Sequence, residues 1–307
     1  MKQAPQRIVS LLASGTELVC ALDLGDKLVG RSHECDYPAW VKRLPEVSRP
    51  TFDISGSSRE IDERVRQRLH RGEPLYEVDE GLLMELAPDV LISQTHCEVC
   101  AVSPADFAHK ISAKLQREQV VALSSGTLEA ILQGFSEVAA VLAVPEAGVA
   151  LVSSIRHGLA QLAQRTSRLP HPSVVCLEWI EPAFAMGNWG PELVELAGGT
   201  SLLGTPGAHS TTTPWSAVRA ADPEVLVVAP CGFGLARTSS ELHLLEQQPG
   251  WRELKAVQSG RVFVADGNLY FNRSGPLLFD TPEILAEMLH PAVFEPKHRG
   301  SVWQRWP

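Results

Sequence analysis

Short runs of consecutive apolar residues alternate along this chain with longer segments in which apolar residues recur every three or four positions. The apolar runs lie within Ile8–Leu12, Asp89–Ser93, Pro223–Val228 and Val262–Ala265. Runs of this kind are typical of parallel strands that are covered on both faces. The segments between them have the periodicity of amphipathic helices. The alternation predicts an α/β fold built on parallel sheets.

The segment from Thr127 to Arg168 departs from this alternation, because it contains no strand pattern and is rich in strong helix formers. Pro145 interrupts it and suits the first position of a new helix, where its missing N–H costs nothing. After this proline, apolar residues recur at helical spacing, at Val149, Val152, Ile155, Leu159 and Leu162. A helix over 145–168 would be about 35 Å long, which is enough to connect two domains.

A similar order of predicted strands and helices lies on each side of this middle segment. Both halves contain a helix that ends at an Ala-Pro-Asp or Ala-Asp-Pro sequence and leads into an apolar strand, at 85–92 and again at 219–227. We therefore predict two Rossmann-like lobes joined by a long backbone helix. The predicted boundaries are an N-terminal lobe over 1–125, a helical linker over 126–169 and a C-terminal lobe over 170–307.

The composition limits the partners and the location that we expect. The chain has 307 residues and a formal net charge of −9, with no basic patch, so nucleic acid is not an expected partner. No stretch is apolar enough to insert into a membrane. Met1 leads into the first strand without an apolar leader. We therefore expect a cytoplasmic protein, or a periplasmic one if a leader has been removed.

The chemically distinctive residues follow the predicted strands. In open parallel sheets, ligands bind beyond the carboxyl ends of the strands. Two such sheets facing each other would form a cleft between the lobes. The segments predicted to line it are 13–17, 33–37, 94–100, 178–189, 231–234 and 266–273.

Two of these segments carry residues that bind metals. Cys97 and Cys100 form a Cys-x-x-Cys pair, and two thiolates at this spacing can hold one tetrahedral metal. The predicted metal ligands are His33, Cys35, His96, Cys97 and Cys100, with zinc as the expected ion. Redox chemistry at the cysteine pair and a purely structural role both remain open.

The order and spacing of several motifs resemble one protein family. These motifs are the Gly-Thr-Glu-Leu at 15–18, the Cys-Asp-Tyr-Pro at 35–38, the Pro-Glu-Val-Ser at 45–48 and the Leu-Ala-Pro-Asp-Val at 86–90. The chain is similar here to the helical-backbone substrate-binding proteins of ABC importers, which bind vitamin B12, haem and ferric siderophores. The likeness covers about 7–290. It implies a two-lobe binding protein and not an enzyme, with a small-molecule ligand held between the lobes.

Within this family the resemblance is greatest to the members that bind vitamin B12, so cobalamin or a related corrinoid is the expected ligand. Matching by motif places Trp179, Trp215 and Phe52 at positions where that branch has aromatic side chains on the ligand. Aromatic side chains also offer a large contact area to any flat ligand, and Arg273 is suited to a carboxylate or phosphate. The full set of expected ligand-binding residues is Thr16, Glu17, His33, Glu34, Asp36, Phe52, Trp179, Glu181, Trp189, His209, Trp215, Phe233, Tyr270 and Arg273.

The resemblance also implies an ABC importer permease as partner, on which family members dock through one glutamate in each lobe. The matching positions here are Gly81, beside Asp79 and Glu80, and Ala221, so the docking glutamates are expected to be absent. Three alternatives remain open. They are a zinc- or iron-binding protein that uses the Cys and His loops, a siderophore- or haem-binding protein, and a thiol-dependent activity on the ligand.

Overall fold

A computed structural model describes residues 5–94, 120–123 and 126–307 of the chain. The first lobe contains a parallel sheet with the strand order β2-β1-β5-β6 and a separate two-stranded antiparallel sheet of β3 and β4. Its strands are β1 (Ile8–Ser10), β2 (Leu28–Arg31), β3 (Ser48–Pro50), β4 (Tyr76–Val78), β5 (Val90–Gln94) and β6 (Val120–Leu123). Its helices are α1 (Ala13–Ala21), η1 (Gly25–Lys27), η2 (Ala39–Arg43), α2 (Ser58–Arg71) and α3 (Glu80–Leu86).

The second lobe contains a six-stranded sheet with the order β12-β11-β10-β7-β8, and β9 pairs with β7. Strands β7, β10 and β11 are parallel to one another. The strands are β7 (Ser173–Trp179), β8 (Phe184–Ala185), β9 (Thr200–Ser201), β10 (Val225–Val228), β11 (Val262–Ala265) and β12 (Trp303–Arg305). The helices are α7 (Gly190–Leu196), α8 (Trp215–Ala221), α9 (Leu235–Glu241), α10 (His243–Glu246), η4 (Trp251–Glu253), α11 (Lys255–Gln258), η5 (Gly267–Phe271), η6 (Pro276–Asp280) and α12 (Thr281–Leu289).

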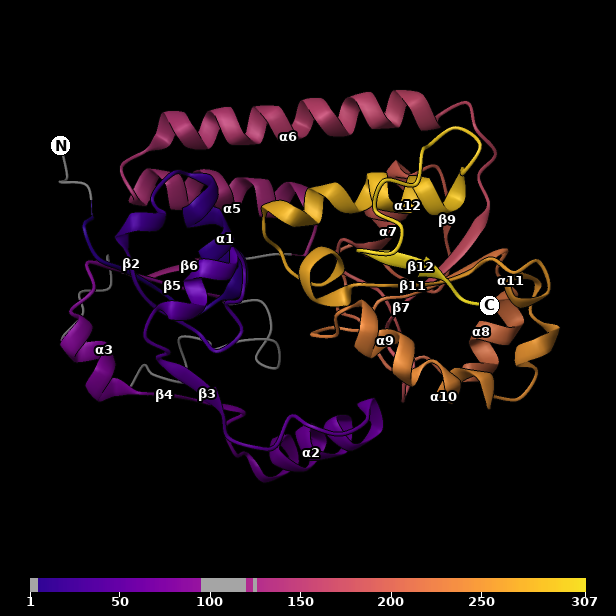
Figure 1. Ribbon diagram of the computed structural model, residues 1–307, viewed down its shortest axis with the longest axis horizontal. Coiled ribbons are helices and arrows are strands. Elements are labelled where there is room, and N and C mark those ends of the chain that lie inside the picture. The colour runs from indigo at the N-terminus through magenta and orange to yellow at the C-terminus, as the bar shows by residue number, and fades with distance from the viewer. Residues whose placement is uncertain (1–4, 95–119, 124–125) are drawn as a thin grey trace.

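Two helices, α5 (Leu128–Val141) and α6 (Pro145–Thr166), join the lobes on one side of the molecule (Figure 1). The chain reverses between them at Ala143, whose φ is 61°, because Pro145 has no N–H with which to continue the preceding helix. Of these two helices, α6, with 22 residues, is the longer and extends over both lobes (Figure 1). The predicted fold of two α/β lobes and a long backbone helix is therefore confirmed.

The lobes also share apolar packing on the side of these helices. Phe135 of α5 meets Phe279 of η6 edge-on, with the ring centroids 5.9 Å apart. One cluster of buried apolar residues extends from Ile8 in the first sheet through α5 to Trp303 in the last strand. Because this cluster spans both lobes, we expect their relative movement to be small.

Two glycines of α6 provide a test of how closely α5 and α6 pack. A Cβ at Gly148 would overlap the Cβ of Ala139 in α5, whereas a Cβ at Gly158 would meet no other atom. We predict that Gly158→Ala raises the free energy of unfolding by about 0.5–1 kcal/mol, because glycine inside a helix is unfavourable by that amount. Gly148→Ala should instead lower it, because the two helices must move apart. Urea denaturation followed by circular dichroism measures both, and equal stabilisation by the two changes would contradict the close contact.

Helix α2 lies on the side of the molecule opposite α6 and extends from the first lobe towards the second (Figure 1). Ser57 caps it, accepting from the backbone N–H of Glu60, while the Glu60 carboxylate accepts from the N–H of Ser57. This reciprocal capping box fixes the start of the helix. The charge-rich sequence of 61–70 indicates a helix surrounded by solvent. In the structure α2 instead also contacts the second lobe.

The last residues of the chain complete the second sheet. Strand β12 pairs antiparallel with β11, at the edge of that sheet. The indole N–H of Trp303 donates to the buried carboxylate of Glu287 in α12 at 2.7 Å. The Trp303 ring also packs edge-on against Phe263 of β11, with centroids 5.6 Å apart. Side-chain contacts therefore hold this short strand in place in addition to its backbone hydrogen bonds.

Candidate functional site

A cluster of charged and polar groups joins the lobes around Arg273, which follows η5 of the second lobe. Its guanidinium donates to the carboxylates of Asp36 at 2.7 Å and Glu17 at 3.3 Å. It also donates to the backbone carbonyl of Glu34 at 3.2 Å and to the side-chain oxygen of Asn268 at 2.7 Å. Asn268 in turn donates to Asp36 at 2.9 Å. We call Glu17, Asp36, Asn268 and Arg273 the Arg273 cluster.

The Arg273 cluster is nearly closed to solvent. The side chain of Glu17 is only 2% exposed and that of Arg273 only 10% exposed. Burial raises the pKa of Glu17 to about 7, although Arg273 acts in the opposite direction. Burial also disfavours the charged form of Asp36, but the hydrogen bonds and charge of Arg273 outweigh it and lower the pKa of that carboxyl. In the described part of the chain, Glu17 Oε2 has no hydrogen-bond partner.

Two expected metal ligands of the first lobe, His33 and Cys35, are engaged separately. Nδ1 of His33 lies 3.1 Å from the hydroxyl of Ser48, and burial lowers the pKa of this imidazole. The Cys35 thiol is buried and accepts from the hydroxyl of Thr16 at 3.0 Å. Burial raises the pKa of Cys35, which opposes the thiolate form that a metal requires. Each of these two residues therefore has a hydroxyl group of the first lobe as its partner.

Over the residues that the structure describes, no group of three or more His, Cys, Asp and Glu side chains lies close enough together to hold a metal ion. The expected ligands His96, Cys97 and Cys100 lie outside the described residues. The zinc site at the Cys-x-x-Cys sequence therefore stays a prediction.

An aromatic pair stands at the carboxyl end of β7 in the second lobe. The rings of Trp179 and Phe233 are 5.2 Å apart and tilted by 57°. The guanidinium of Arg237, on α9, lies 3.7 Å from the centroid of the Phe233 ring, within the range of a cation–π contact. The indole N–H of Trp179 is buried, and no hydrogen-bond partner for it exists among the described residues.

The start of α2 contacts the second lobe close to this pair. The backbone N–H of Ser58 donates to the carboxylate of Glu241 at 2.8 Å, and Arg237 donates to the carbonyl of Gly56 at 3.1 Å. Arg59 forms an ion pair with Glu181, two residues beyond Trp179. About two turns further along α2, Arg66 donates to the hydroxyl of Thr212 at 3.0 Å.

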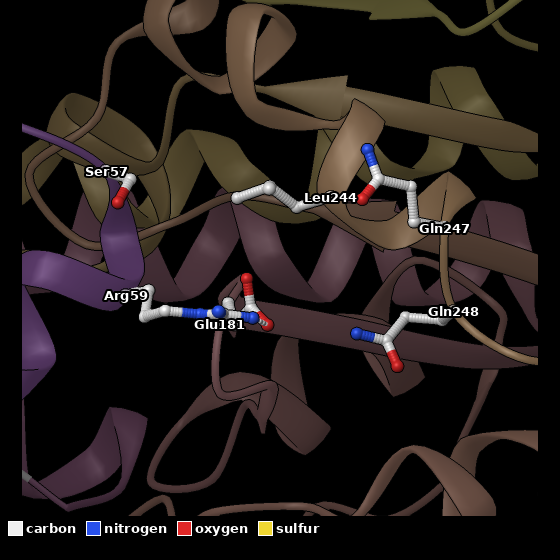
Figure 2. A pocket seen from close by; sticks show the side chains of 6 residues that line it. All are labelled: Ser57, Arg59, Glu181, Leu244, Gln247 and Gln248. Carbon is white, nitrogen blue, oxygen red and sulfur yellow. Dashed lines mark hydrogen bonds and ion pairs between the residues drawn. The ribbon is translucent and has the colours of Figure 1, made fainter.

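A pocket of about 370 Å³ lies between α2 and the second lobe (Figure 2). This volume is at the lower end of the range of about 300–1,000 Å³ that is usual for small-molecule sites. Its lining is mostly polar, and we call it the polar pocket. The residues that line it are Ser57, Arg59, Glu181, Leu244, Gln247 and Gln248.

The other expected ligand-binding aromatics are engaged in packing contacts. Trp189 is buried, and its indole N–H donates to the carbonyl of Phe271 at 2.9 Å. Trp215 stacks on Trp251 with centroids 6.0 Å apart, and its N–H donates to the carbonyl of Pro249 at 2.9 Å. Trp189 thus packs against η5, which contains Asn268, and Trp215 packs against the segment around Trp251.

The remaining expected residues are dispersed. Phe52 lies under the guanidinium of Arg68, 6.0 Å from its ring centroid. Tyr270 is half-buried in η5, and burial raises the pKa of its phenol. His209 is exposed in the loop before α8. The fourteen expected ligand-binding residues thus include one group around Arg273 and a second group around Trp179.

The two positions expected to replace docking glutamates lie in helices at the surface. Gly81 is in α3, which the carboxylate of Asp79 caps by accepting from the N–H of Leu82 at 2.8 Å. Ala221 ends α8 and is followed by Asp222, which accepts from the backbone of Lys255 at 2.9 Å and pairs with its ammonium group at 3.2 Å. An acidic residue therefore lies next to each position, Asp79 near Gly81 and Asp222 after Ala221. Both carboxylates already accept hydrogen bonds within the protein.

Sequence reasoning missed the residues that complete both groups. Arg59 lies in 45–60, which the sequence indicates to be irregular, Arg237 lies outside the predicted elements, and Asn268 is not distinguished within 266–273. Gln247 and Gln248 belong to no motif. One available signal was the reciprocal Ser-x-x-Glu sequence at 57–60, which marks the start of α2.

Comparison with known proteins shows which family has this architecture. A family model described as periplasmic binding protein matches residues 8–269. The chain belongs to this family. It therefore is a class III substrate-binding protein of the kind that serves ABC importers, which confirms the prediction of a binding role instead of an enzymatic one.

Individual relatives agree with the family. An uncharacterised ABC transporter substrate-binding lipoprotein of Bacillus subtilis, YvrC, is 25% identical over 309 residues, which cover 96% of this chain and 83% of that protein. The structure is similar to that of the periplasmic vitamin B12-binding protein BtuF of Vibrio cholerae, with 20% identity, a TM-score of 0.68 and coverage of 94% and 98% of the two chains. It is also similar to a periplasmic heme-binding protein from Pseudomonas aeruginosa, with 24% identity, a TM-score of 0.72 and coverage of 94% of each chain.

The family corrects one expectation from the sequence. A cytoplasmic location is wrong, because the chain belongs to a family of extracytoplasmic substrate-binding proteins. In the described residues, no helix has both the length and the apolar character needed to cross a membrane.

Proposed function

We propose that this binding protein takes up a corrinoid, cobalamin or a close relative, between its lobes and presents it to an ABC importer. Membership of the family supports substrate binding for import. The choice of a flat metal chelate rests on the residues at the carboxyl end of β7 and around α2.

The observation that carries the proposal is the state of Trp179. Its ring packs on Phe233 at the end of β7, and its indole N–H is buried without a partner among the described residues. An unpaired buried donor costs about 1–3 kcal/mol. A ligand that stacks on the exposed part of the Trp179 ring, and accepts a hydrogen bond from the indole once the ring turns towards the cleft, would remove that cost. A corrinoid has both properties, because it is a flat macrocycle with carbonyl oxygens around its rim.

Two further classes of chelate compete for the same place. Haem is also flat, and ferric siderophores also carry many oxygen acceptors. Both stay candidates for the ligand because the family as a whole takes up cobalamin, haem and iron chelates. The purified protein can be titrated with all three classes to decide between them.

We predict that cyanocobalamin binds with a measurable heat in isothermal titration and that Trp179→Ala weakens this binding by tenfold or more, equivalent to about 1.4 kcal/mol or above. The reason is the loss of one aromatic contact, worth about 0.5–1.5 kcal/mol beyond area burial, together with the hydrogen bond from the indole. Trp40→Ala is the matched control. Trp40 is 38% exposed and packs over Gly25 of η1 in the first lobe.

The outcome separates the candidates. If hemin or a ferric siderophore binds and cobalamin does not, the ligand is that chelate and not a corrinoid. Equal effects of Trp179→Ala and Trp40→Ala on cobalamin affinity would show that Trp179 does not contact the ligand.

A further inference from the structure

The polar pocket is formed by both lobes. Ser57 and Arg59 come from the start of α2, whereas Glu181 follows β7 and the other three residues lie on and after α10. Figure 2 shows the Arg59 side chain reaching Glu181 across the pocket, with the amide groups of Gln247 and Gln248 on the far side. A ligand group that enters this space therefore contacts both lobes at once.

The charges in the lining cancel. Arg59 and Glu181 are the charged residues that line the pocket, and they form an ion pair with each other. The side chain of Glu181 is only 17% exposed, so its carboxylate depends on Arg59 for compensation. A partly buried charge that loses its partner is costly. The ion pair therefore should stay closed when a ligand binds.

The uncharged lining offers hydrogen bonds of both kinds. The side-chain amides of Gln247 and Gln248 make no hydrogen bond to another described residue, and each carries two N–H donors and one carbonyl acceptor. The hydroxyl of Ser57, by contrast, is engaged with Glu60 in the cap of α2. Two primary amides in the lining match a group that donates and accepts in the same way, such as another primary amide.

The polar pocket lies near the aromatic pair, although neither Trp179 nor Phe233 lines it. Glu181 follows Trp179 by two residues, so their Cα atoms lie at most about 7 Å apart. Arg237 touches the Phe233 ring and donates to the carbonyl of Gly56, next to Ser57 of the pocket. The rim of a flat ligand on Trp179 would therefore be within reach of the pocket.

We propose that the polar pocket binds an uncharged amide arm on the rim of the metal chelate and selects against a carboxylate there. This inference rests on the proposed function and narrows it. The rim of a corrinoid carries primary amides, whereas the rim of haem carries carboxylates. The pocket thus makes this protein selective for the corrinoid.

The selection against a carboxylate comes from Glu181. A carboxylate in the pocket would meet a neighbouring carboxylate of like charge. If Arg59 turned to the ligand, it would leave Glu181 unpaired. Both arrangements lower the affinity for a ligand that carries a carboxylate there. An unfavourable contact of this kind is a common source of specificity.

The test compares pairs of ligands that differ only in amide against acid. The first pair is cyanocobalamin and its monocarboxylic acids, in which one rim amide is hydrolysed, with each positional isomer used separately. The second pair is the diamide of hemin and hemin itself. Isothermal titration of the full chain gives the affinity for each. We expect at least one monocarboxylic isomer to bind about tenfold more weakly than cyanocobalamin, because one hydrogen bond to the amides is replaced by like-charge repulsion.

Three variants locate the effect. Glu181→Gln should abolish the preference for amide over acid, because Arg59 is then free to pair with the carboxylate. The double change Gln247→Glu with Gln248→Glu should weaken cyanocobalamin itself by about tenfold. Gln258→Glu, at the exposed end of α11, adds the same charge outside the pocket and should leave every affinity unchanged. The thermal midpoint of each variant confirms that it is folded.

Separate outcomes address the two proposals. Binding of cyanocobalamin together with equal affinity for all its acids would overturn the amide selection and leave the proposed function standing. Tighter binding of hemin than of its diamide would also overturn the amide selection. If none of these chelates binds, the proposed function fails, and the selection fails with it.

Discussion

Arg273→Met is expected to lower the free energy of unfolding by about 3–5 kcal/mol, the usual cost of leaving a buried charge without its partner. Arg273 supplies the positive charge of a cluster that holds the carboxylates of Glu17 and Asp36. Methionine has a similar length and keeps the apolar packing, so the loss measures the electrostatic part. Urea denaturation followed by circular dichroism, at pH 8, gives the free energy of unfolding.

Two further variants make this result specific. Arg219→Met removes an exposed partner of Glu253, and an exposed pair contributes only about 0–1 kcal/mol. Adding Glu17→Gln and Asp36→Asn to Arg273→Met should restore part of the loss, because no unpaired charge then remains buried. If Arg273→Met and Arg219→Met lowered the free energy of unfolding equally little, the Arg273 cluster would contribute no more to stability than an exposed ion pair does.

The second large effect concerns pH and Glu17. Burial raises the pKa of this carboxyl to about 7 in the folded protein, above its ordinary value of about 4.5. The folded state therefore binds this proton more tightly than the unfolded state does. The resulting stabilisation is fully present below pH 4.5 and is lost as the pH rises through about 7, by a total of about 3 kcal/mol.

We predict that Glu17→Gln removes this loss, because glutamine keeps the shape of the protonated carboxyl and cannot ionise. The difference in unfolding free energy between variant and wild type should grow in favour of the variant from pH 4.5 to pH 8. Other groups near the cluster also shift, with the pKa lowered for Asp36 and raised for Asp266 and Tyr270. They are present in both proteins, so their contributions largely cancel in the difference. Parallel curves for the two proteins over this range would contradict the assignment.

The main elements of the fold could be predicted from the sequence because their signals are local. An apolar run such as 262–265 corresponds to β11 without change. Pro145 correctly marks the first residue of α6. In each case the pattern that specifies the element lies within the element itself.

The site could be predicted only in part, because its contacts join residues far apart in the chain. The pairing of Arg59 with Glu181 spans 122 residues, and nothing in the charged sequence of α2 indicates that partner. Trp215 follows a motif that suggested a ligand contact, yet Trp251 lies against it and occupies one face of its ring. The sequence specifies that both residues are aromatic, but packing in the folded chain decides whether an aromatic ring faces a ligand or another ring.

The short final strand has a consequence for the behaviour of this protein at high concentration. Strand β11 is buried along its whole length, and without β12 it would form the open edge of the second sheet. An apolar edge strand is a template for pairing with other chains and for aggregation. The chain instead ends this sheet with three residues, of which Arg305 is exposed and bonded through its guanidinium to the carbonyl of Gly260. A short edge strand that carries a positive charge discourages such pairing. Strand β12 therefore protects the protein from edge-to-edge self-association.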